Sequence, residues 1–252
     1  MKHIKRKFLQ LHKLENNINE LFQNAEVLSI NSSLNDDKVP WIITTDNESV
    51  QGFFYNIKGK RVIIPEPNPI VIYFSNAQGF LADLLKHRGQ LLEELQSPNP
   101  ELGNLLNSMF AFYGCSVNFC SSLFDSLEAF INSKIPKNYT YINAKGKKLK
   151  KYEEIRYLSF EDKIKIVLPD IYPSKNLLIT KGHIFEQLKL LKKLRDDITH
   201  AKSDINFEVN YYEKLFTEAL DFDYVRAIEG ARDFINFYEK DLIEPCDCGL
   251  EH

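Results

Sequence analysis

The chain has 252 residues, of which 44% are hydrophobic and 27% charged, with a formal net charge of −3. Such a composition is typical of a globular protein with room for one large domain, and the charge excludes a general electrostatic attraction to nucleic acid. No apolar run approaches the roughly 18–20 residues that span a bilayer. The basic start MKHIKRKFLQLHKL lacks the apolar core of a signal peptide. We therefore expect a cytoplasmic protein without a membrane partner.

The first 95 residues are predicted to form a separate N-terminal region. Helical spacing of apolar residues predicts an amphipathic helix over residues 3–24, with Ile4, Phe8, Leu11, Ile18 and Leu21 on one side. Three short β-like runs follow between residues 26 and 67, namely VPWIITT, QGFFYNI and RVIIPEP. The segment NIKGK between the last two runs predicts a hairpin turn. We therefore expect a small strand-bearing element after the first helix.

Two long helices are predicted next, and each starts at an Asn-Pro pair. Asn68 as cap and Pro69 in the first turn predict the helix that closes the N-terminal region. Asn99 and Pro100 predict a second helix of more than 30 residues, which is on the order of 50 Å long. A helix of that length is either the spine of a bundle or kinked, and Gly114 is the candidate position for a kink.

The rest of the chain is also predicted to be mainly helical. The expected elements are a short helix with a capping box at Ser159 and Asp162 that ends before Pro169, a helix over residues 181–202, and a helical region over residues 211–242 with a break at 221–223. We therefore expect an all-α fold, a bundle of long antiparallel helices over residues 96–245, with the small β-containing element before it.

A lysine-rich connector, KIPKNYTYINAKGKKLKK (residues 134–151), joins two of these helices. It is either a solvated loop or a contact for the RNA backbone. In the second interpretation the contacts come from Lys147, Lys148, Lys150 and Lys151, and the ring of Tyr139 or Tyr141 stacks on a base. The dependence of RNA binding on salt concentration distinguishes these two interpretations of the connector.

The four cysteines predict neither a disulfide framework nor a metal site. Cys115 and Cys120 fall in a predicted apolar helix and are expected to be small core residues. Cys246 and Cys248 form a C-x-C sequence in the tail 246–252, which offers too few ligands and is too isolated for a tetrahedral zinc site; the alternative interpretation is a reactive or metal-binding tail. Residues 250–252 resemble the start of a polyhistidine tag and are left out of the functional argument.

Several signatures of catalysis are absent from the sequence. It contains no phosphate-binding loop, no dinucleotide-binding glycine pattern, no H-E-x-x-H and no G-x-S-x-G, and the six histidines do not cluster at metal-ligand spacing. We therefore expect no cofactor and no metal ion.

One residue breaks an otherwise ordinary amphipathic pattern. Leu188, Leu191, Leu194 and Ile198 predict one buried helix face, and Arg195 lies within that stripe. An arginine near a reacting phosphate supplies a fixed bidentate positive charge, and a histidine can transfer a proton at neutral pH. Arg195 and His200 therefore suffice in principle for metal-independent RNA cleavage, in which the ribose 2′-OH is the nucleophile.

Two segments resemble the HEPN superfamily of helical-bundle domains, FCSSLFDSLEAFINSKIP (119–136) and LRDDITHAK (194–202). The family pattern is an arginine, four to six residues and a histidine, with a polar residue directly after the arginine, and the resemblance covers roughly residues 100–240. It implies a metal-independent RNase that works as a homodimer. Arg195 then binds the scissile phosphate, His200 transfers the proton and Asp196 is the supporting polar residue.

Helix geometry limits how these residues can act together. Five residues at about 100° each separate Arg195 and His200 by roughly 140° on an ideal helix. A site formed by two chains, or a helix that ends near Thr199, would resolve the mismatch. Alternatively, Arg195 pairs with Asp125 or Glu128 of the neighbouring helix and His200 caps a helix end.

Two functional hypotheses follow. In the first, the protein is a metal-independent endoribonuclease of the toxin or phage-defence type, with RNA as substrate and an antitoxin or defence protein as partner. In the second, it is a non-catalytic HEPN-like module whose function is dimerisation through the long helices.

Overall fold

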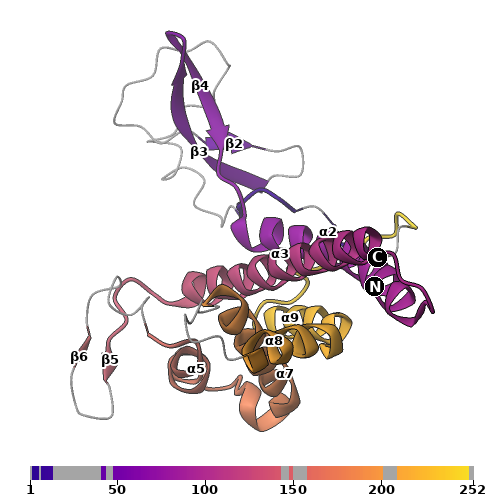
Figure 1. Ribbon diagram of the computed structural model, residues 1–252. Coiled ribbons are helices and arrows are strands. Elements are labelled where there is room, and N and C mark those ends of the chain that lie inside the picture. The colour runs from indigo at the N-terminus through magenta and orange to yellow at the C-terminus, as the bar shows by residue number, and fades with distance from the viewer. Residues whose placement is uncertain are drawn as a thin grey trace. The chain divides into compact units, whose positions relative to one another are not determined.

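The computed structural model describes residues 2–5, 7–13, 41–43, 48–142, 148–149, 158–200 and 209–249 (Figure 1). The chain divides into two compact units. The strand unit is Arg6–Ile72, and the helical unit combines Met1–Lys5 with Tyr73–His252. The boundary expected between residues 95 and 96 falls within the helical unit.

The strand unit contains a four-stranded antiparallel sheet around β3 (Glu48–Ile57). Its other strands are β1 (Leu11–Lys13), β2 (Trp41–Ile43) and β4 (Lys60–Pro65). The first half of β3 pairs with β1 and β2, so that Val50 lies opposite both Leu11 and Ile42. The second half pairs with β4, with Phe54 opposite Ile63. The predicted strand-bearing element is therefore confirmed.

The predicted hairpin turn is also confirmed, between β3 and β4. Lys58 and Gly59 occupy its two central positions, with φ values of 48° and 79°. Two positive φ angles in succession give the turn type whose twist matches that of paired strands. Glycine adopts such a φ without steric cost, which explains its place in the second position.

The predicted helix over residues 3–24 is wrong for the part that the structure describes. Ile4 forms a bridge with Pro245, Leu9 forms one with Pro67, and residues 11–13 are β1. Apolar spacing cannot distinguish a helix from an extended chain whose N–H and C=O groups are satisfied by distant partners. Residues 14–24 lie outside the described part.

Helix α2 (Pro69–Gln96) begins as predicted, because the Asn68 side chain accepts hydrogen bonds from the backbone N–H of Ile70 (3.2 Å) and Val71 (3.5 Å). Helix α3 (Leu102–Lys134) differs at its start. Its N-cap is Glu101, which makes no side-chain cap hydrogen bond, so the cap predicted at Asn99 is wrong. The helix continues without interruption through Gly114 for 33 residues.

The connector after α3 contains two short paired strands, β5 (Tyr141–Ile142) and β6 (Lys148–Leu149). A helical segment then runs through α5 (Phe160–Asp162), the π-helical turn η1 (Lys163–Val167) and α6 (Leu168–Ile171). The predicted cap at Ser159 is confirmed, since its side chain accepts from the Asp162 N–H (3.0 Å).

The predicted end of this segment before Pro169 is wrong. After the wide π turn, in which the Leu168 N–H donates to the Lys163 carbonyl, Pro169 lies in the first turn of α6. A proline is tolerated there, because the first residues of a helix need no N–H partner one turn back.

Three further helices complete the helical unit: α7 (Leu177–Thr199), α8 (Val209–Asp221) and α9 (Tyr224–Tyr238). The side chain of Asn176 caps α7, which has one non-helical residue, Lys181 (φ −144°, ψ 46°). The chain is kinked at Lys181, where the predicted helix begins, a short helical turn precedes the kink, and the helix ends at Thr199. The break predicted at residues 221–223 is confirmed, between α8 and α9.

The core of the helical unit lies where α3, α7 and α9 pack together (Figure 1). Phe119 and Tyr224 meet edge to face with their ring centroids 5.3 Å apart, and Phe130 and Phe234 meet in the same way at 5.9 Å. All four side chains are buried, and each such burial contributes about 1.5–3 kcal/mol. The buried Cys120 confirms its predicted core role. The fold is thus mainly helical, as expected.

No helix in the described part of the chain has both the length and the hydropathy that crossing a bilayer requires.

Candidate functional site

The three predicted catalytic residues lie at the C-terminal end of α7. Leu188, Leu191 and Leu194 are buried there, which confirms the predicted buried face. Arg195 lies at the edge of this face, and 29% of its side chain is exposed. The guanidinium is therefore partly open to solvent, so its charge is not isolated in the core.

Two contacts hold the Arg195 side chain. Its Cζ lies 5.0 Å from the centroid of the Phe124 ring on α3, a cation–π arrangement. Its Nη1 donates a hydrogen bond to Oδ1 of Asp196 (3.0 Å). A cation over an aromatic face is stabilised by about 0.5–2 kcal/mol, depending on how far it is desolvated. Together, the ring and the carboxylate orient the guanidinium at the junction of α3 and α7.

Asp196 lies between two cations. Its carboxylate accepts hydrogen bonds from Lys192, one turn earlier on α7, and from Arg195. Burial acts to raise the pKa of this carboxyl, but the two hydrogen bonds and the two positive charges outweigh it and lower the pKa below its usual value. Asp196 is therefore an anion at neutral pH, as the role of a supporting residue for Arg195 requires.

His200 is the C-cap of α7, and its backbone N–H donates to the Asp196 carbonyl. Its side chain is exposed. Among the described residues, Arg195 makes its polar contact with Asp196 and none with His200. The helix ends at Thr199, as the alternative interpretation in which His200 caps a helix end requires.

In the alternative interpretation, Arg195 pairs with Asp125 or Glu128 of α3. Glu128 instead contacts Lys163, whose Nζ lies 3.0 Å from its carboxylate. Asp125 lies close enough to Arg195 to feel its charge. Burial raises the pKa of the Asp125 carboxyl, the positive charge of Arg195 counteracts this rise, and the negative charge of Glu128 adds to it. Two acidic residues of α3 therefore lie near this end of α7, one close to Arg195 and the other paired with Lys163.

Both tyrosines of the connector, which were predicted to stack on an RNA base, make contacts within the protein. Tyr141 is 5% exposed and packs with Ile135 and Val167. A base cannot stack on a buried ring, so this conformation does not fit RNA stacking by Tyr141. Tyr139 is half-buried and donates to Asp170 (2.9 Å). Lys148 is exposed on β6, whereas Lys147, Lys150 and Lys151 lie outside the described residues.

A shallow groove lies closer to the start of α7. It is lined by His183, Glu186, Gln187, Leu190, Asp221, Phe222, Asp223, Arg226 and Ala227. Neither Arg195 nor His200 lines it, so the groove is separate from the Arg/His residues.

A second group of reactive side chains was not expected from the sequence. His3, Cys246 and Cys248 lie together in the helical unit, with their ligand atoms within 4.8 Å of one another. The expectation that the two cysteines are isolated is therefore wrong. His3 is more than 240 positions away in the sequence, and no local spacing pattern connects it with the C-x-C sequence.

Comparisons with protein-family models, with curated proteins and with solved structures find no match for this chain.

Proposed function

We propose that the helical unit is a HEPN-like, metal-independent endoribonuclease that acts as a homodimer. The proposal is based on the orientation and the exposure of the Arg195 side chain. Its guanidinium is oriented by Asp196 and Phe124 and is still partly exposed, and an exposed His200 follows at the end of the same helix. An arginine fixed in this way can bind a phosphate without first losing much side-chain freedom.

In the proposed reaction, the ribose 2′-oxygen attacks the adjacent phosphorus and the bond to the 5′-oxygen breaks. The products are a 2′,3′-cyclic phosphate and a 5′-hydroxyl. Arg195 stabilises the negative charge on the phosphate oxygens, and His200 transfers a proton. The reaction needs one proton removed and one delivered. A dimer provides one His200 from each chain for these two steps and brings an Arg and a His together across the interface.

The test is cleavage of a mixed set of RNAs in EDTA, with analysis of the product ends. We expect His200→Ala to lower the cleavage rate by about 100-fold or more, which is typical for the loss of a general acid or base. Arg195→Lys keeps the charge but loses the bidentate geometry, so we expect a smaller but clear loss. His183→Ala is the matched control, because His183 is an exposed histidine of the same helix.

The proposed chemistry is supported if the products carry cyclic phosphate ends. It is also supported if RNA with a 2′-deoxy nucleotide at the scissile position is not cleaved. Equal rates for the wild type and His200→Ala would rule out the catalytic role of His200. Changing Lys147, Lys148, Lys150 and Lys151 together to Ala tests the connector. A salt dependence of RNA binding that stays the same after these changes excludes it as an RNA contact.

A second function, dimerisation without catalysis, is favoured by an exposed apolar surface on the two longest helices. Its residues are Leu85, Leu92 and Leu95 of α2 with Leu102, Leu106 and Phe110 of α3. Leu102, Leu106 and Phe110 follow one another at four-residue steps, and therefore lie along one side of α3. Exposed apolar surfaces of this kind are typical of protein–protein contacts.

Light scattering coupled to gel filtration tests this second function. We expect the wild type to be dimeric and Phe110→Asp to be monomeric with unchanged helix content. Ile179→Asp is the control, because Ile179 is 81% exposed but lies on α7, apart from this surface. A monomeric wild type at all accessible concentrations contradicts both the module and the two-chain active site.

A further inference from the structure

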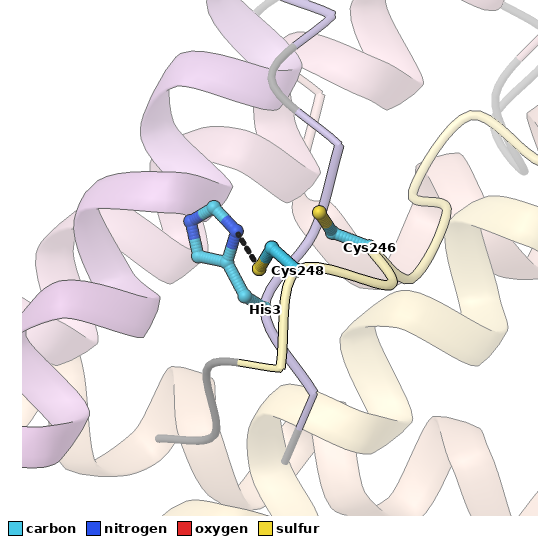
Figure 2. A group of neighbouring side chains, drawn as sticks. All are labelled: His3, Cys246 and Cys248. Carbon is cyan, nitrogen blue, oxygen red and sulfur yellow. Dashed lines mark hydrogen bonds between the residues drawn. The ribbon is translucent and has the colours of Figure 1, made fainter.

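Three side chains with metal-binding atoms converge where the first residues of the chain meet its C-terminal segment. Figure 2 shows the His3 imidazole grouped with the thiols of Cys246 and Cys248. Nδ1 of His3 lies 3.6 Å from Sγ of Cys248, and all the ligand atoms of the group lie within 4.8 Å of one another. His3 is 9% exposed, Cys246 is half-buried and Cys248 is exposed.

One of these separations matches the distance between two ligand atoms in a tetrahedral zinc site. With Zn–N of about 2.0–2.1 Å and Zn–S of about 2.3 Å, tetrahedral angles place a nitrogen about 3.6 Å from a sulfur and two sulfurs about 3.8 Å apart. The distance between His3 Nδ1 and Cys248 Sγ already has this value. The thiol of Cys246 therefore needs to move by no more than about one ångström to complete the group.

Backbone hydrogen bonds hold the two segments in register. The Lys5 N–H donates to the Glu244 carbonyl (2.8 Å), the Cys246 N–H donates to the His3 carbonyl (2.6 Å), and Ile4 bridges Pro245. Two cysteines separated by one residue point to the same face of an extended strand, so both thiols can approach His3. The chain then bends at Cys248 and Gly249, where Gly249 has a φ of +77°.

Each of the two segments is also fixed to a different helix. The side chain of Gln78 on α2 accepts from the Ile4 N–H (3.3 Å) and donates to the Lys2 carbonyl (2.8 Å). The side chain of Asn236 on α9 donates to the Ile243 carbonyl (2.9 Å) and accepts from the Ile243 N–H (3.0 Å). The fold therefore holds the backbone segments that carry His3, Cys246 and Cys248, and an ion would have to adjust only their side chains.

We propose that His3, Cys246 and Cys248 bind one Zn²⁺ ion, which links the N-terminal and C-terminal segments of the helical unit. Two thiolates and one imidazole are a donor set that suits zinc and not the oxygen-seeking ions Mg²⁺ and Ca²⁺. The two thiolates also neutralise the charge of the ion. Three protein ligands leave a fourth position, on the exposed side of Cys248, for water or an exogenous ligand. This proposal is independent of the RNase activity.

The test is a titration of the full-length, reduced protein with Zn²⁺ at neutral pH, followed by calorimetry and by thermal unfolding. All proteins carry His252→Ala, so that this histidine cannot act as a ligand. We expect one ion per chain. At about 100 times the dissociation constant, ligand linkage predicts a rise in the melting temperature of about 5–10 °C. Co²⁺ in place of Zn²⁺ should give the near-ultraviolet absorption of cobalt–thiolate bonds.

Three variants identify the ligands: His3→Ala, Cys246→Ser and Cys248→Ser. We expect each to weaken Zn²⁺ binding by at least about 10–100-fold and therefore to reduce the thermal shift to about half or less. Cys248 is exposed, so its change leaves the fold intact, which circular dichroism verifies. Cys115→Ser is the matched control, because it removes a half-buried thiol of α3. The proposal is overturned if the wild type binds no Zn²⁺, or if Cys115→Ser weakens binding as much as Cys248→Ser does.

Discussion

Lys163 is buried to 1% exposure, and its ammonium lies 3.0 Å from the carboxylate of Glu128 on the neighbouring helix α3. A buried ammonium is stable only while its partner is charged and in contact with it. The pair therefore joins the π-helical turn to α3 at the point where α3 also contacts Arg195 through Phe124.

We predict that Glu128→Gln destabilises the protein by about 3–5 kcal/mol, because it leaves the charge of Lys163 buried without a partner. Urea unfolding at pH 7 measures this change. Glu161→Gln is the matched control, since it removes the partner of the exposed Lys165 and should cost less than about 1 kcal/mol. Equal effects of the two changes would show that burial of Lys163 does not determine the energy of its ion pair.

A second prediction compares the two Asn-Pro pairs. Asn68→Ala should lower the free energy of unfolding by about 1–2 kcal/mol, because it removes the hydrogen bonds to the first N–H groups of α2. Asn99→Ala should change it by less than about 0.5 kcal/mol, because Glu101 is the N-cap of α3. Thermal unfolding of both variants measures the difference. A larger effect at Asn99 contradicts the observed start of α3.

A third prediction concerns Gly114 in the interior of α3. A Cβ added there meets nothing within 4 Å, so Gly114→Ala should stabilise the protein by about 0.5–1 kcal/mol through its higher helix propensity. Gly230→Ala is the contrasting variant, because its Cβ would lie 2.4 Å from Oε1 of Gln187, which then has to rotate away. We therefore expect Gly230→Ala not to show the stabilisation that is expected for Gly114→Ala. Chemical denaturation distinguishes the two outcomes, and a destabilising Gly114→Ala contradicts the open space around that position.

A fourth prediction concerns alkaline pH. Burial raises the pKa of the Tyr224 hydroxyl far above its usual value, although its hydrogen bond with Ser116 acts in the opposite direction. The folded protein therefore keeps this proton at pH values where the unfolded chain loses it. The resulting stability is complete below pH 10 or so and falls as the pH rises further, by up to about 1.4 kcal/mol per pH unit.

Urea unfolding between pH 8 and pH 11 measures this dependence. Tyr224→Phe should lower stability at pH 8, because the Ser116 hydroxyl loses its partner, but should reduce the slope above pH 10. Tyr73→Phe is the control, since Tyr73 is 37% exposed and should leave the slope unchanged. An unchanged slope in Tyr224→Phe means that other groups determine the alkaline transition.

Local sequence patterns predicted many turns, caps and helix ends, because the interactions involved span only a few residues. The side-chain caps at Asn68 and Ser159, the Lys58-Gly59 turn and the break between α8 and α9 are of this kind. The cap at Asn99 failed although its dipeptide is the same as that at Asn68. Asn68 is buried and its N–H donates to the Phe8 carbonyl (2.7 Å), whereas Asn99 is exposed. A tertiary contact of this kind is not encoded in the dipeptide.

The features that were missed depend on partners far away in the chain. The first residues are extended because Ile4 pairs with Pro245, and their apolar spacing carries no information about that partner. The group of His3, Cys246 and Cys248 depends on the same pairing. For the Arg/His residues, the helix was predicted to run to residue 202, whereas α7 ends at Thr199 with His200 as its C-cap, which agrees with the alternative interpretation of His200. The cation–π contact of Arg195 with Phe124 was not foreseen, because the relative position of two helices is a property of their packing.

The strand unit interrupts the helical unit in the chain, since Met1–Lys5 belongs to the helical unit and Arg6–Ile72 does not. During synthesis, Ile4 emerges long before its partner Pro245. The helical unit can therefore complete its hydrogen bonding only after Pro245 has also been synthesised. For the same reason, a fragment that begins at Tyr73 would lack the residues that satisfy Gln78 and the backbone of residues 244–246. A circular permutant that begins at Tyr73 and carries Met1–Lys5 after its C-terminal segment is a more suitable route to the isolated helical unit.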